Sequence, residues 1–388
     1  MSIRALVMLT QLEQSVGRAK AFLHDSLVAK VPFLAEFLSS VLDLLVGPLT
    51  GNRTAHYWVG VLVALLLAGL LFVAQFRHQP GFGLRGFLGY CFPRYLLTHP
   101  STATDIKLMV ANNFIMPMVN VTWRLKTAFF TGILLNGLVA IFGPPLHVFE
   151  WNIGAVIVFT ILLAFAEDLG FYLCHLAHHK IPALWAFHKV HHSADVLTPL
   201  TATRNHPVEF MLIPPCKALA GSLVMAPALF LFDQPPTVLE IFGVSVLTMF
   251  FAMLGDQLFH SHIWLTWSPA LQRVFVCPAQ HQIHHSSAVR HHDKNMAAFF
   301  SLWDWVFGTL YIAPKQREDF AYGVHGDAKQ RHPGLLTAYA LPFWDALPQR
   351  ATVLRWLPAR LVGGLRGLVQ SAQQAVAARS VRRHADTL

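Results

Sequence analysis

Three histidine motifs with helical spacing constrain the fold of this chain more than any other feature. They read HxxxH at 175–179, HxxHH at 188–192 and HxxHH at 281–285. Residues three and four apart share one face of an α-helix, so each motif predicts a helix that presents its imidazoles together. Most of the chain's 22 histidines lie between residues 175 and 292, a density that packing does not require. Because neutral imidazole is the commonest protein ligand for transition metals, the motifs predict a histidine-built metal centre.

The number of histidines in these motifs predicts two metal ions. The motif residues are His175, His179, His188, His191, His192, His281, His284 and His285. A structural zinc site takes about four ligands and a catalytic one about three, so this set is too large for one zinc ion. Carboxylate-bridged di-iron bundles use a Glu-x-x-His pattern that the sequence lacks, so we expect an all-nitrogen site. His260, at the end of a long apolar segment, and His206, before a proline, are further candidate ligands.

Several polar residues are expected to support these ligands. Asp168 lies seven residues before His175 on the same helical face, and Asp256 lies one turn before His260. A carboxylate that accepts a hydrogen bond from a ligand ring fixes its orientation, which is the role we expect for both. The same role, or a place in the lipid headgroup zone, is open for Glu209, Asp293 and Asp304. We expect His178 and His262 to be neighbours of the site, and His291 and His292 to be loop residues.

Composition indicates an integral membrane protein. Hydrophobic residues make up 54% of the 388 residues and charged residues 13%, and the mean hydropathy is +0.47. A soluble domain would carry about a quarter charged residues. The net charge of +9 comes with basic residues beside apolar segments, which favours contact with anionic lipid headgroups over nucleic acid. The four cysteines form no CxxC pair, so neither a disulfide framework nor a cysteine-zinc site is expected.

The apolar segments predict an all-α, multi-pass membrane protein with about four transmembrane helices. They cover residues 59–76, 127–143, 152–179, 218–232 and 237–259, the last two forming a helical hairpin. An amphipathic helix over 33–46 is expected to lie at the interface. The 81–86 segment matches GxGxxG but follows an apolar helix instead of a strand, so we expect a loop and no dinucleotide site.

Loop charges predict the orientation in the membrane. The 77–126 loop is rich in Lys and Arg, whereas the turns at 144–151 and 233–236 have none, which places the 77–126 loop in the cytoplasm. Counting crossings puts the histidine motifs there too, as a helical cap on the bundle. We expect an interfacial region over 1–55, a first helix pair over 56–150, a catalytic domain over 151–315 and a basic tail over 316–388, in a bacterial inner membrane rather than the endoplasmic reticulum. The tail from 349 is either amphipathic on the lipid surface or solvated.

The region from 168 to 311 resembles the fatty acid hydroxylase superfamily, which includes sterol desaturases and lipid hydroxylases. The resemblance is carried by His175-x3-His179, Trp185-Ala-Phe-His188-Lys-Val-His191-His192-Ser193, Arg204-Asn-His206-Pro207-Val-Glu209, His260-Ser261, His281-Gln-Ile-His284-His285-Ser286, Asp293-Lys-Asn295 and Trp303-Asp304-Trp-Val-Phe307-Gly308-Thr309. It implies a membrane-embedded oxidase with two iron ions, which zinc can replace in a purified protein. Such an enzyme uses O2 to attack a C–H bond of a sterol, fatty acyl, sphingoid or ether lipid. Leu176 replaces the family's usual arginine, and Asn295-Met296-Ala297 its usual Asn-Tyr-Gly.

The sequence leaves no room for a haem domain, so electrons are expected from a separate donor, either a ferredoxin or cytochrome b5 with its reductase. Two other functions compete with the oxidase. A histidine-rich membrane metal transporter or metal-binding protein usually places its ligands at the bilayer midplane or in a flexible loop, whereas these histidines have helical spacing where helices leave the membrane. A zinc-dependent membrane hydrolase would need an acidic general base beside three ligands.

Overall fold

The computed structural model describes residues 52–122, 127–241, 244–324, 326 and 334–347. These residues are predominantly helical, and their one sheet is a two-stranded antiparallel hairpin of β1 (Glu240–Ile241) and β2 (Val244–Ser245). The all-α expectation is therefore confirmed in its coarse form. The amphipathic helix expected over 33–46 and the tail from 349 lie outside the described residues.

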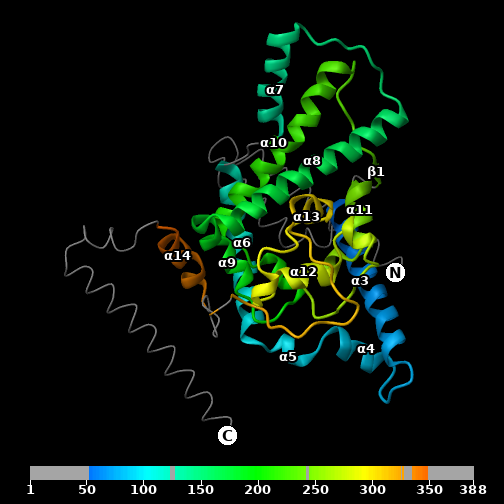
Figure 1. The fold of residues 1–388 in the computed structure, drawn as a ribbon, viewed down its shortest axis with the longest axis vertical. Helices are drawn as coiled ribbons and strands as arrows, with labels where there is room; N and C mark the ends of the chain where they lie inside the picture. Colours follow the sequence, from blue (N-terminus) through cyan, green and yellow to red (C-terminus); the bar gives the residue numbers. More distant parts are fainter. Residues whose placement is uncertain (1–51, 123–126, 242–243, 325, 327–333, 348–388) are drawn as a thin grey trace, which may run out of the picture.

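The helices follow one another as in Figure 1. The first half contains α3 (Asn52–Phe76), α4 (Leu84–Cys91), α5 (Arg94–Leu97), α6 (Pro100–Thr122), α7 (Thr127–Phe142) and α8 (Ile153–Lys180). The second half contains α9 (Pro182–His192), α10 (Pro207–Leu231), α11 (Val246–Met253), α12 (Pro278–His284), α13 (Leu302–Phe307) and α14 (Leu335–Ala346). Short 3-10 turns are η1 (Pro199–Thr203), η2 (Asp256–Leu258), η3 (Leu271–Arg273) and η4 (Val289–His291).

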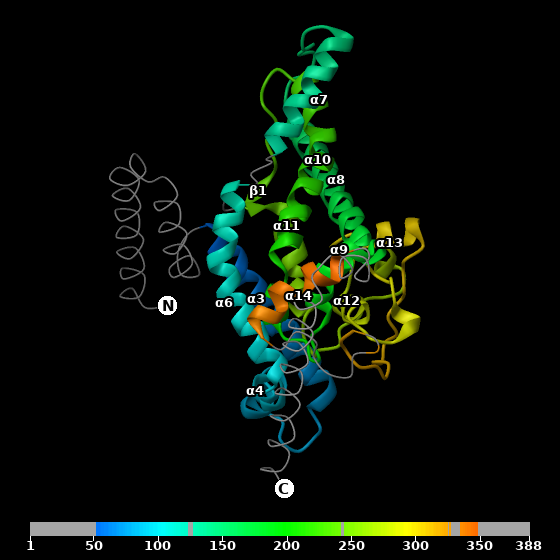
Figure 2. The ribbon, with the colours of Figure 1, turned by 90° about the vertical axis from the view of Figure 1, so that its left-hand side faces the viewer.

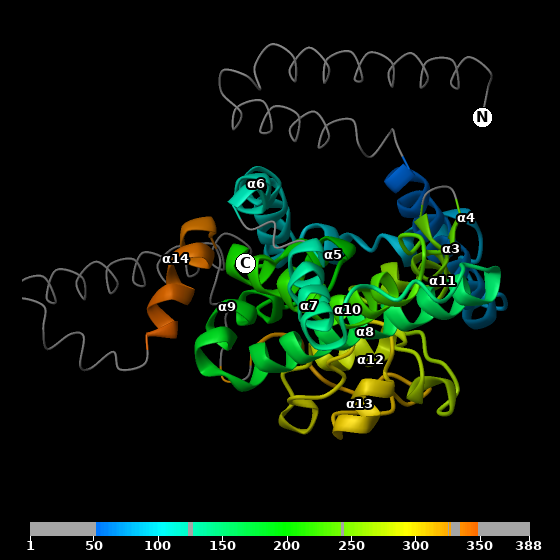
Figure 3. The same cartoon turned by 90° about the horizontal axis from the view of Figure 1, so that it is seen from above.

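Helices α8 and α10 form the centre of the fold. Both are long and apolar enough to cross a membrane, and α10 lies between α7 and α8 in Figures 1 and 3. The two backbones approach closely at Gly170, where an added Cβ would lie 2.6 Å from the carbonyl oxygen of Cys216. Helix α8 begins after Asn152, whose side chain accepts from the backbone N–H of Ala155, and ends before Pro182, as the sequence predicts.

The apolar stretches of α3 and α7, Gly60–Phe76 and Ala128–Phe142, are shorter than helices α8 and α10. Figure 2 shows α7 and the adjoining parts of α8 and α10 projecting away from α9, α12 and α14. Seen from above, α12 and α13 lie on one side of α8 and α6 lies on the other (Figure 3). The histidine-bearing helices are therefore gathered at one end of the α8–α10 pair.

The long helix expected over 237–259 is wrong. This segment forms the β1–β2 hairpin, the eight-residue helix α11 and then η2. Helix α11 is too short to span a bilayer. Gly255 lies between α11 and η2 with φ 78°, and an added Cβ there would lie 2.9 Å from Leu67 Cδ1 of α3. Phe251 is 5% exposed and stacks on Phe299 at 4.1 Å, whereas Met253 is 61% exposed, so protein covers part of this apolar segment.

The basic segment 77–126 is largely helical, because α4, α5 and most of α6 lie within it. The GxGxxG sequence follows α3, a helix, as expected, but only its first part is a loop, because Gly83 is the N-cap residue of α4 and residues 84–86 lie in that helix. Helix α14, from the region expected to be a tail, packs on α9 through an ion pair between Lys189 and Asp345. The tail region therefore helps to cover a histidine-bearing helix.

Candidate metal centre

The predicted ligand histidines converge into two groups. In each group the candidate nitrogen atoms all lie within 4.8 Å of one another. The five-histidine group contains His175, His179, His188, His192 and His284, and the four-histidine group contains His191, His260, His281 and His285. They come from α8, α9, α12 and the loop after η2. Every residue of the three sequence motifs belongs to one of the groups, and so does His260.

Each HxxHH motif contributes to both groups, which the sequence did not predict. On α9, His188 and His192 belong to the five-histidine group and His191 to the other. On α12 the pattern is reversed, with the middle residue His284 in the five-histidine group. Consecutive residues are about 100° apart around a helix axis, so neighbouring rings can turn toward different centres. The motifs thus join the two groups instead of building one each.

The Nε2 atoms are arranged as ligands and not as a hydrogen-bond network. The Nε2 of His260 lies 2.9 Å from that of His281, 3.1 Å from that of His285 and 3.2 Å from that of His191. A ring nitrogen carries one proton or one lone pair, so it cannot form three hydrogen bonds at once. Ligand nitrogens about 2.1 Å from a metal ion and at right angles to each other would be about 3.0 Å apart. The spacing therefore fits a shared cation.

The five-histidine group has the same geometry. The Nε2 of His188 lies 3.0 Å from that of His175 and 3.1 Å from that of His192. The Nε2 atoms of His179 and His284 are buried and have no hydrogen-bond partner among the described residues. Leaving such atoms unsatisfied is costly, and coordination of a metal ion would satisfy them.

Burial keeps these rings in the form that binds metals. Burial lowers the pKa well below the ordinary value for His188, His192, His281 and His285, and the neighbouring histidines lower it further. Burial also lowers the pKa of His284 to about 4. At neutral pH these imidazoles are uncharged, and each keeps a lone pair for a cation.

The loop after η4 holds two ligand rings through its backbone. The Nδ1 of His175 lies 2.6 Å from the carbonyl oxygen of Met296, and the Nδ1 of His284 lies 2.9 Å from that of Lys294. A ring that donates from Nδ1 presents its Nε2 to a metal. Asp304 fixes this loop in turn, because its carboxylate accepts from the backbone N–H groups of Met296 and Ala297.

Two carboxylates contact ligands of the five-histidine group. The Nδ1 of His188 lies 3.1 Å from Glu209 Oε1, and the Nδ1 of His179 lies 3.7 Å from Asp293 Oδ1. The contact with His179, and then that with Lys180, lowers the pKa of Asp293 below its usual range. For Glu209 and Asp293 the structure therefore favours a place beside ligands over a place among lipid headgroups.

Two aspartates were expected to support ligand histidines. Asp168 contacts a different group from the one expected, and Asp256 lies near its expected partner. Asp168 is buried, and its Oδ2 accepts from the backbone N–H of Phe300, so its hydrogen bond supports the loop and not His175. Asp256 shares a cavity wall with His260 and His281.

His206 belongs to neither group. Its Nδ1 accepts from the backbone N–H of Val208 at the start of α10, and its Nε2 lies 3.1 Å from the carbonyl oxygen of Tyr339. Both ring nitrogens are therefore engaged, and the residue caps a helix instead of serving as the expected ligand. His178 and His262 also lie outside the groups, where they contact the carbonyl oxygens of Cys174 and Tyr90.

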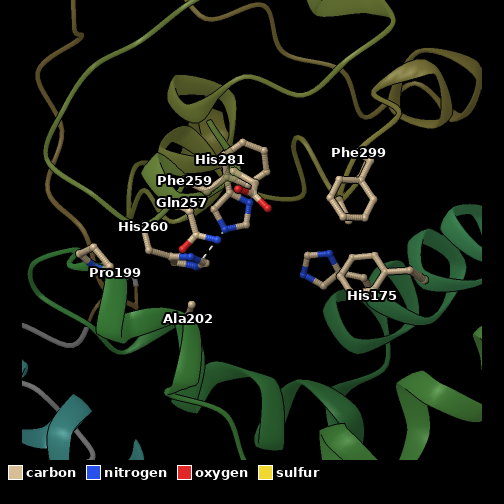
Figure 4. Close-up of a pocket in the computed structure, with 12 residues that line it drawn as sticks. His175, Pro199, Ala202, Gln257, Phe259, His260, His281 and Phe299 are labelled. Carbon is tan, nitrogen blue, oxygen red and sulfur yellow. Dashed lines mark hydrogen bonds between the residues drawn. The ribbon is translucent and has the colours of Figure 1, made fainter. Parts of the chain in front are cut away.

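A cavity of about 280 Å³ adjoins both groups. His175 from the five-histidine group and His260 and His281 from the other line it. Figure 4 shows His260 and His281 on one side, near Phe259 and Gln257, and His175 with Phe299 on the other. The remaining walls are mainly apolar, with Phe171, Ala202 and Ala297 among them. An apolar chain placed here would lie against histidines of both groups.

Comparison with known proteins agrees with the geometry. Residues 160–309 match the family model described as fatty acid hydroxylase. Ornithine lipid hydroxylase OlsE of Rhizobium tropici is 25% identical over 195 residues, which are 50% of this chain and 52% of that protein. Alkylglycerol monooxygenase of Homo sapiens is 27% identical over 157 residues, 40% of this chain and 31% of that protein. A cholesterol 25-hydroxylase-like protein of Danio rerio is 27% identical over 253 residues, 60% of this chain and 89% of that protein.

The chain spans about half of the length of OlsE and about a third of the alkylglycerol monooxygenases. No solved structure matches it significantly. The relatives named above carry the names of lipid hydroxylases and monooxygenases, and they give no support to a metal transporter.

Proposed function

Because residues 160–309 form a fatty acid hydroxylase domain, we propose that this chain is a membrane-bound, O2-dependent di-iron oxidoreductase. Its substrate is a membrane lipid, either a sterol or a fatty acyl, sphingoid or ether lipid, which it hydroxylates or desaturates. The observation that supports this proposal most strongly is the convergence of nine neutral histidines into two groups that share one apolar cavity.

The nine histidines are the proposed ligands of two iron ions, and zinc can replace the iron in a purified protein. Bound iron would supply the redox chemistry with O2 that no side chain provides. The protein supplies uncharged nitrogen ligands, fixed ring orientations and an apolar surrounding. Four ligands leave room at an ion that takes five or six, so the four-histidine group is the better place for a small molecule to bind.

Asp256 and Asp168 are proposed to position the site rather than to touch the reacting atoms. Asp256 lies on the cavity wall with His260 and His281, where it can orient the edge of the four-histidine group. Asp168 holds the backbone at Phe300, and this loop continues into the cavity wall at Phe299. Both carboxylates would act through the groups that they hold in place.

The cavity chemistry supports a lipid substrate. Phenyl and aliphatic side chains exclude water and bind alkyl carbon, while the histidines supply the polar edge. The outer face of α8 is apolar, with Val158 55% and Leu162 51% exposed, so lipid chains can lie along the helix that carries His175 and His179. A substrate would then reach the cavity from the bilayer.

We propose that α8 and α10 cross the membrane and that α3 and α7 complete a bundle of about four spans. The basic segment 77–126 supports a cytoplasmic metal centre, and a bacterial inner membrane is the proposed location. The catalytic domain is proposed to cover 151–315, after a first helix pair in 56–150. Electrons would come from a separate protein, a ferredoxin or cytochrome b5 with its reductase.

Mass spectrometry of lipid extracts tests the proposal. Cells that express the chain should contain a lipid that has gained one oxygen atom or lost two hydrogen atoms, and cells that express His284→Ala should not. His262→Gln is the matched control, because His262 lies outside both groups and glutamine keeps a donor for the carbonyl of Tyr90. Product that forms under strict exclusion of O2 would contradict the oxidase and favour a hydrolase.

A further inference from the structure

The two histidine groups differ in how their rings are held on the side away from the metal. In the five-histidine group, the Nδ1 atoms of His175 and His284 contact backbone carbonyl oxygens. Those of His188 and His179 have a carboxylate oxygen at 3.1 Å and 3.7 Å, which is an electrostatic contact and not a hydrogen bond. In the four-histidine group, the Nδ1 atoms of His191, His281 and His285 are buried and have no hydrogen-bond partner among the described residues, and none of these rings has a carboxylate in ion-pair contact. The five-histidine group is therefore the more firmly held set of ligands.

We propose that the five-histidine group retains its metal ion more tightly than the four-histidine group, and that Glu209 and Asp293 are positioning residues that produce the difference. The inference rests on the two-ion site of the proposed function. It adds a difference in metal retention between the two groups and attributes this difference to two carboxylates that are not ligands.

The first reason is orientation. A ligand ring that is fixed at Nδ1 loses little freedom when its Nε2 binds a metal ion, and a carboxylate partner also raises the basicity of the ring. Asp293 reaches His179 from a left-handed backbone conformation with φ 57°, and its other oxygen lies 2.5 Å from Lys180 Nζ. Aspartate tolerates this conformation better than most residues. The loop thus places one carboxylate between a ligand and a lysine at the surface.

The second reason is charge. The Glu209 side chain is buried, and its Oε2 has no hydrogen-bond partner among the described residues. Its other oxygen, Oε1, lies 3.1 Å from the Nδ1 of His188. A buried carboxylate is costly without a nearby positive charge. An ion held by His188 and its group would supply that charge, so metal binding and burial of Glu209 stabilise each other.

The less firmly held ion would face the cavity. His260 and His281 of the four-histidine group line the cavity, whereas His175 is the one lining residue from the other group. The four-histidine group also offers fewer ligands. The ion that exchanges more readily would thus be the one beside the proposed substrate, and the better-retained ion would be the one held by His188, which contacts Glu209 of α10.

Release of metal to a chelator tests this inference. Full-length protein in detergent is loaded with zinc to two ions per chain and then mixed with an excess of a colorimetric chelator. We expect two phases of one ion each. Glu209→Gln and Asp293→Asn should each speed the slow phase by about 10–100-fold, the usual effect of losing such a partner, and leave the fast phase unchanged. Glu318→Gln is the control, because Glu318 bonds Arg290 and Tyr311 and contacts neither group.

Several results would overturn the inference: release of both ions in one phase, acceleration of the fast phase by either variant, or unchanged release from both. If Glu209→Gln does not fold, Asp293→Asn decides alone, because its carboxylate is 38% exposed and tolerates exchange. Zinc release needs no turnover. Two phases with no lipid product would therefore reject the proposed function and leave the inference standing, whereas failure to load two ions would reject both.

Discussion

Arg204 and Asp105 form an ion pair with no solvent exposure on either side chain, and Nη1 lies 2.8 Å from Oδ1. The same guanidinium donates to the carbonyl oxygens of Val190 and Ser193, which flank His191 and His192 in the sequence. A residue of α6, outside the family-matched region, thus fixes the last turn of a ligand-bearing helix.

Asp105→Ala should destabilise the protein by about 3–5 kcal/mol, because it leaves the Arg204 charge buried and uncompensated. Thermal or denaturant unfolding in detergent measures the change. Arg290→Ala is the matched comparison. Arg290 is half-exposed in its ion pair with Glu318, so this pair should contribute less than about 1 kcal/mol. Equal losses of stability in the two variants would contradict the burial of the Arg204–Asp105 ion pair.

His191→Ala and His192→Ala should remove different ions, although the residues are adjacent. His191 belongs to the four-histidine group and His192 to the five-histidine group. Each variant should lose its own ion in metal analysis, and each should lose lipid product. Loss of the same phase of zinc release in both variants would show that the two rings share one ion.

Gly170→Ala should destabilise the α8–α10 contact by about 1–3 kcal/mol, the usual cost of overpacking. The new Cβ would lie 2.6 Å from the carbonyl oxygen of Cys216 and 2.8 Å from the Cβ of Ala220. Gly137→Ala, in α7, meets no atom within 4 Å and should stabilise its helix by about 0.5–1 kcal/mol. Melting temperatures in detergent should therefore move in opposite directions, and a common direction would argue against close packing at Gly170.

The metal-free protein should lose stability as the pH falls from about 6.5 toward 4. Burial lowers the pKa of His191 and of His284 to about 4 in the folded state, while the unfolded chain protonates near 6.5. Between these values the unfolded state binds more protons, so each residue contributes a slope of up to about 1.4 kcal/mol per pH unit. Chelator-treated samples unfolded at a series of pH values measure this slope. A flat profile in this range would contradict the burial of the two rings as neutral groups.

The convergence of the candidate ligands could be predicted from the sequence because helical spacing is local, and the structure brings all eight motif residues and His260 into the two groups. Helix α8 was predictable for the same reason, since Asn152 and Pro182 mark its ends. The division of each HxxHH motif between the two groups could not be predicted. A shared helical face does not determine where neighbouring rings point once a second helix packs against them.

The errors have a common physical cause. The 237–259 segment packs partly against protein, at Leu67 and Phe299, and composition does not distinguish such a segment from a helix that spans a membrane. The prediction for His206 failed for a similar reason, since a histidine before a proline is compatible with both a metal ligand and a helix cap. Glu209 and Asp293 reach their histidines only through tertiary packing, so the sequence could offer them no more than two alternative roles.

The adjacent pairs His191–His192 and His284–His285 each send one ring to each group. Consecutive α-carbons are separated by about 3.8 Å across a rigid peptide unit, so covalent geometry helps to set the separation of the two centres. A single residue inserted into or deleted from either helix before the pair would rotate both rings by about 100° around the helix axis and move both away from their groups. A change in the helix backbone would therefore alter both centres at once, whereas a substitution of one side chain would alter only one.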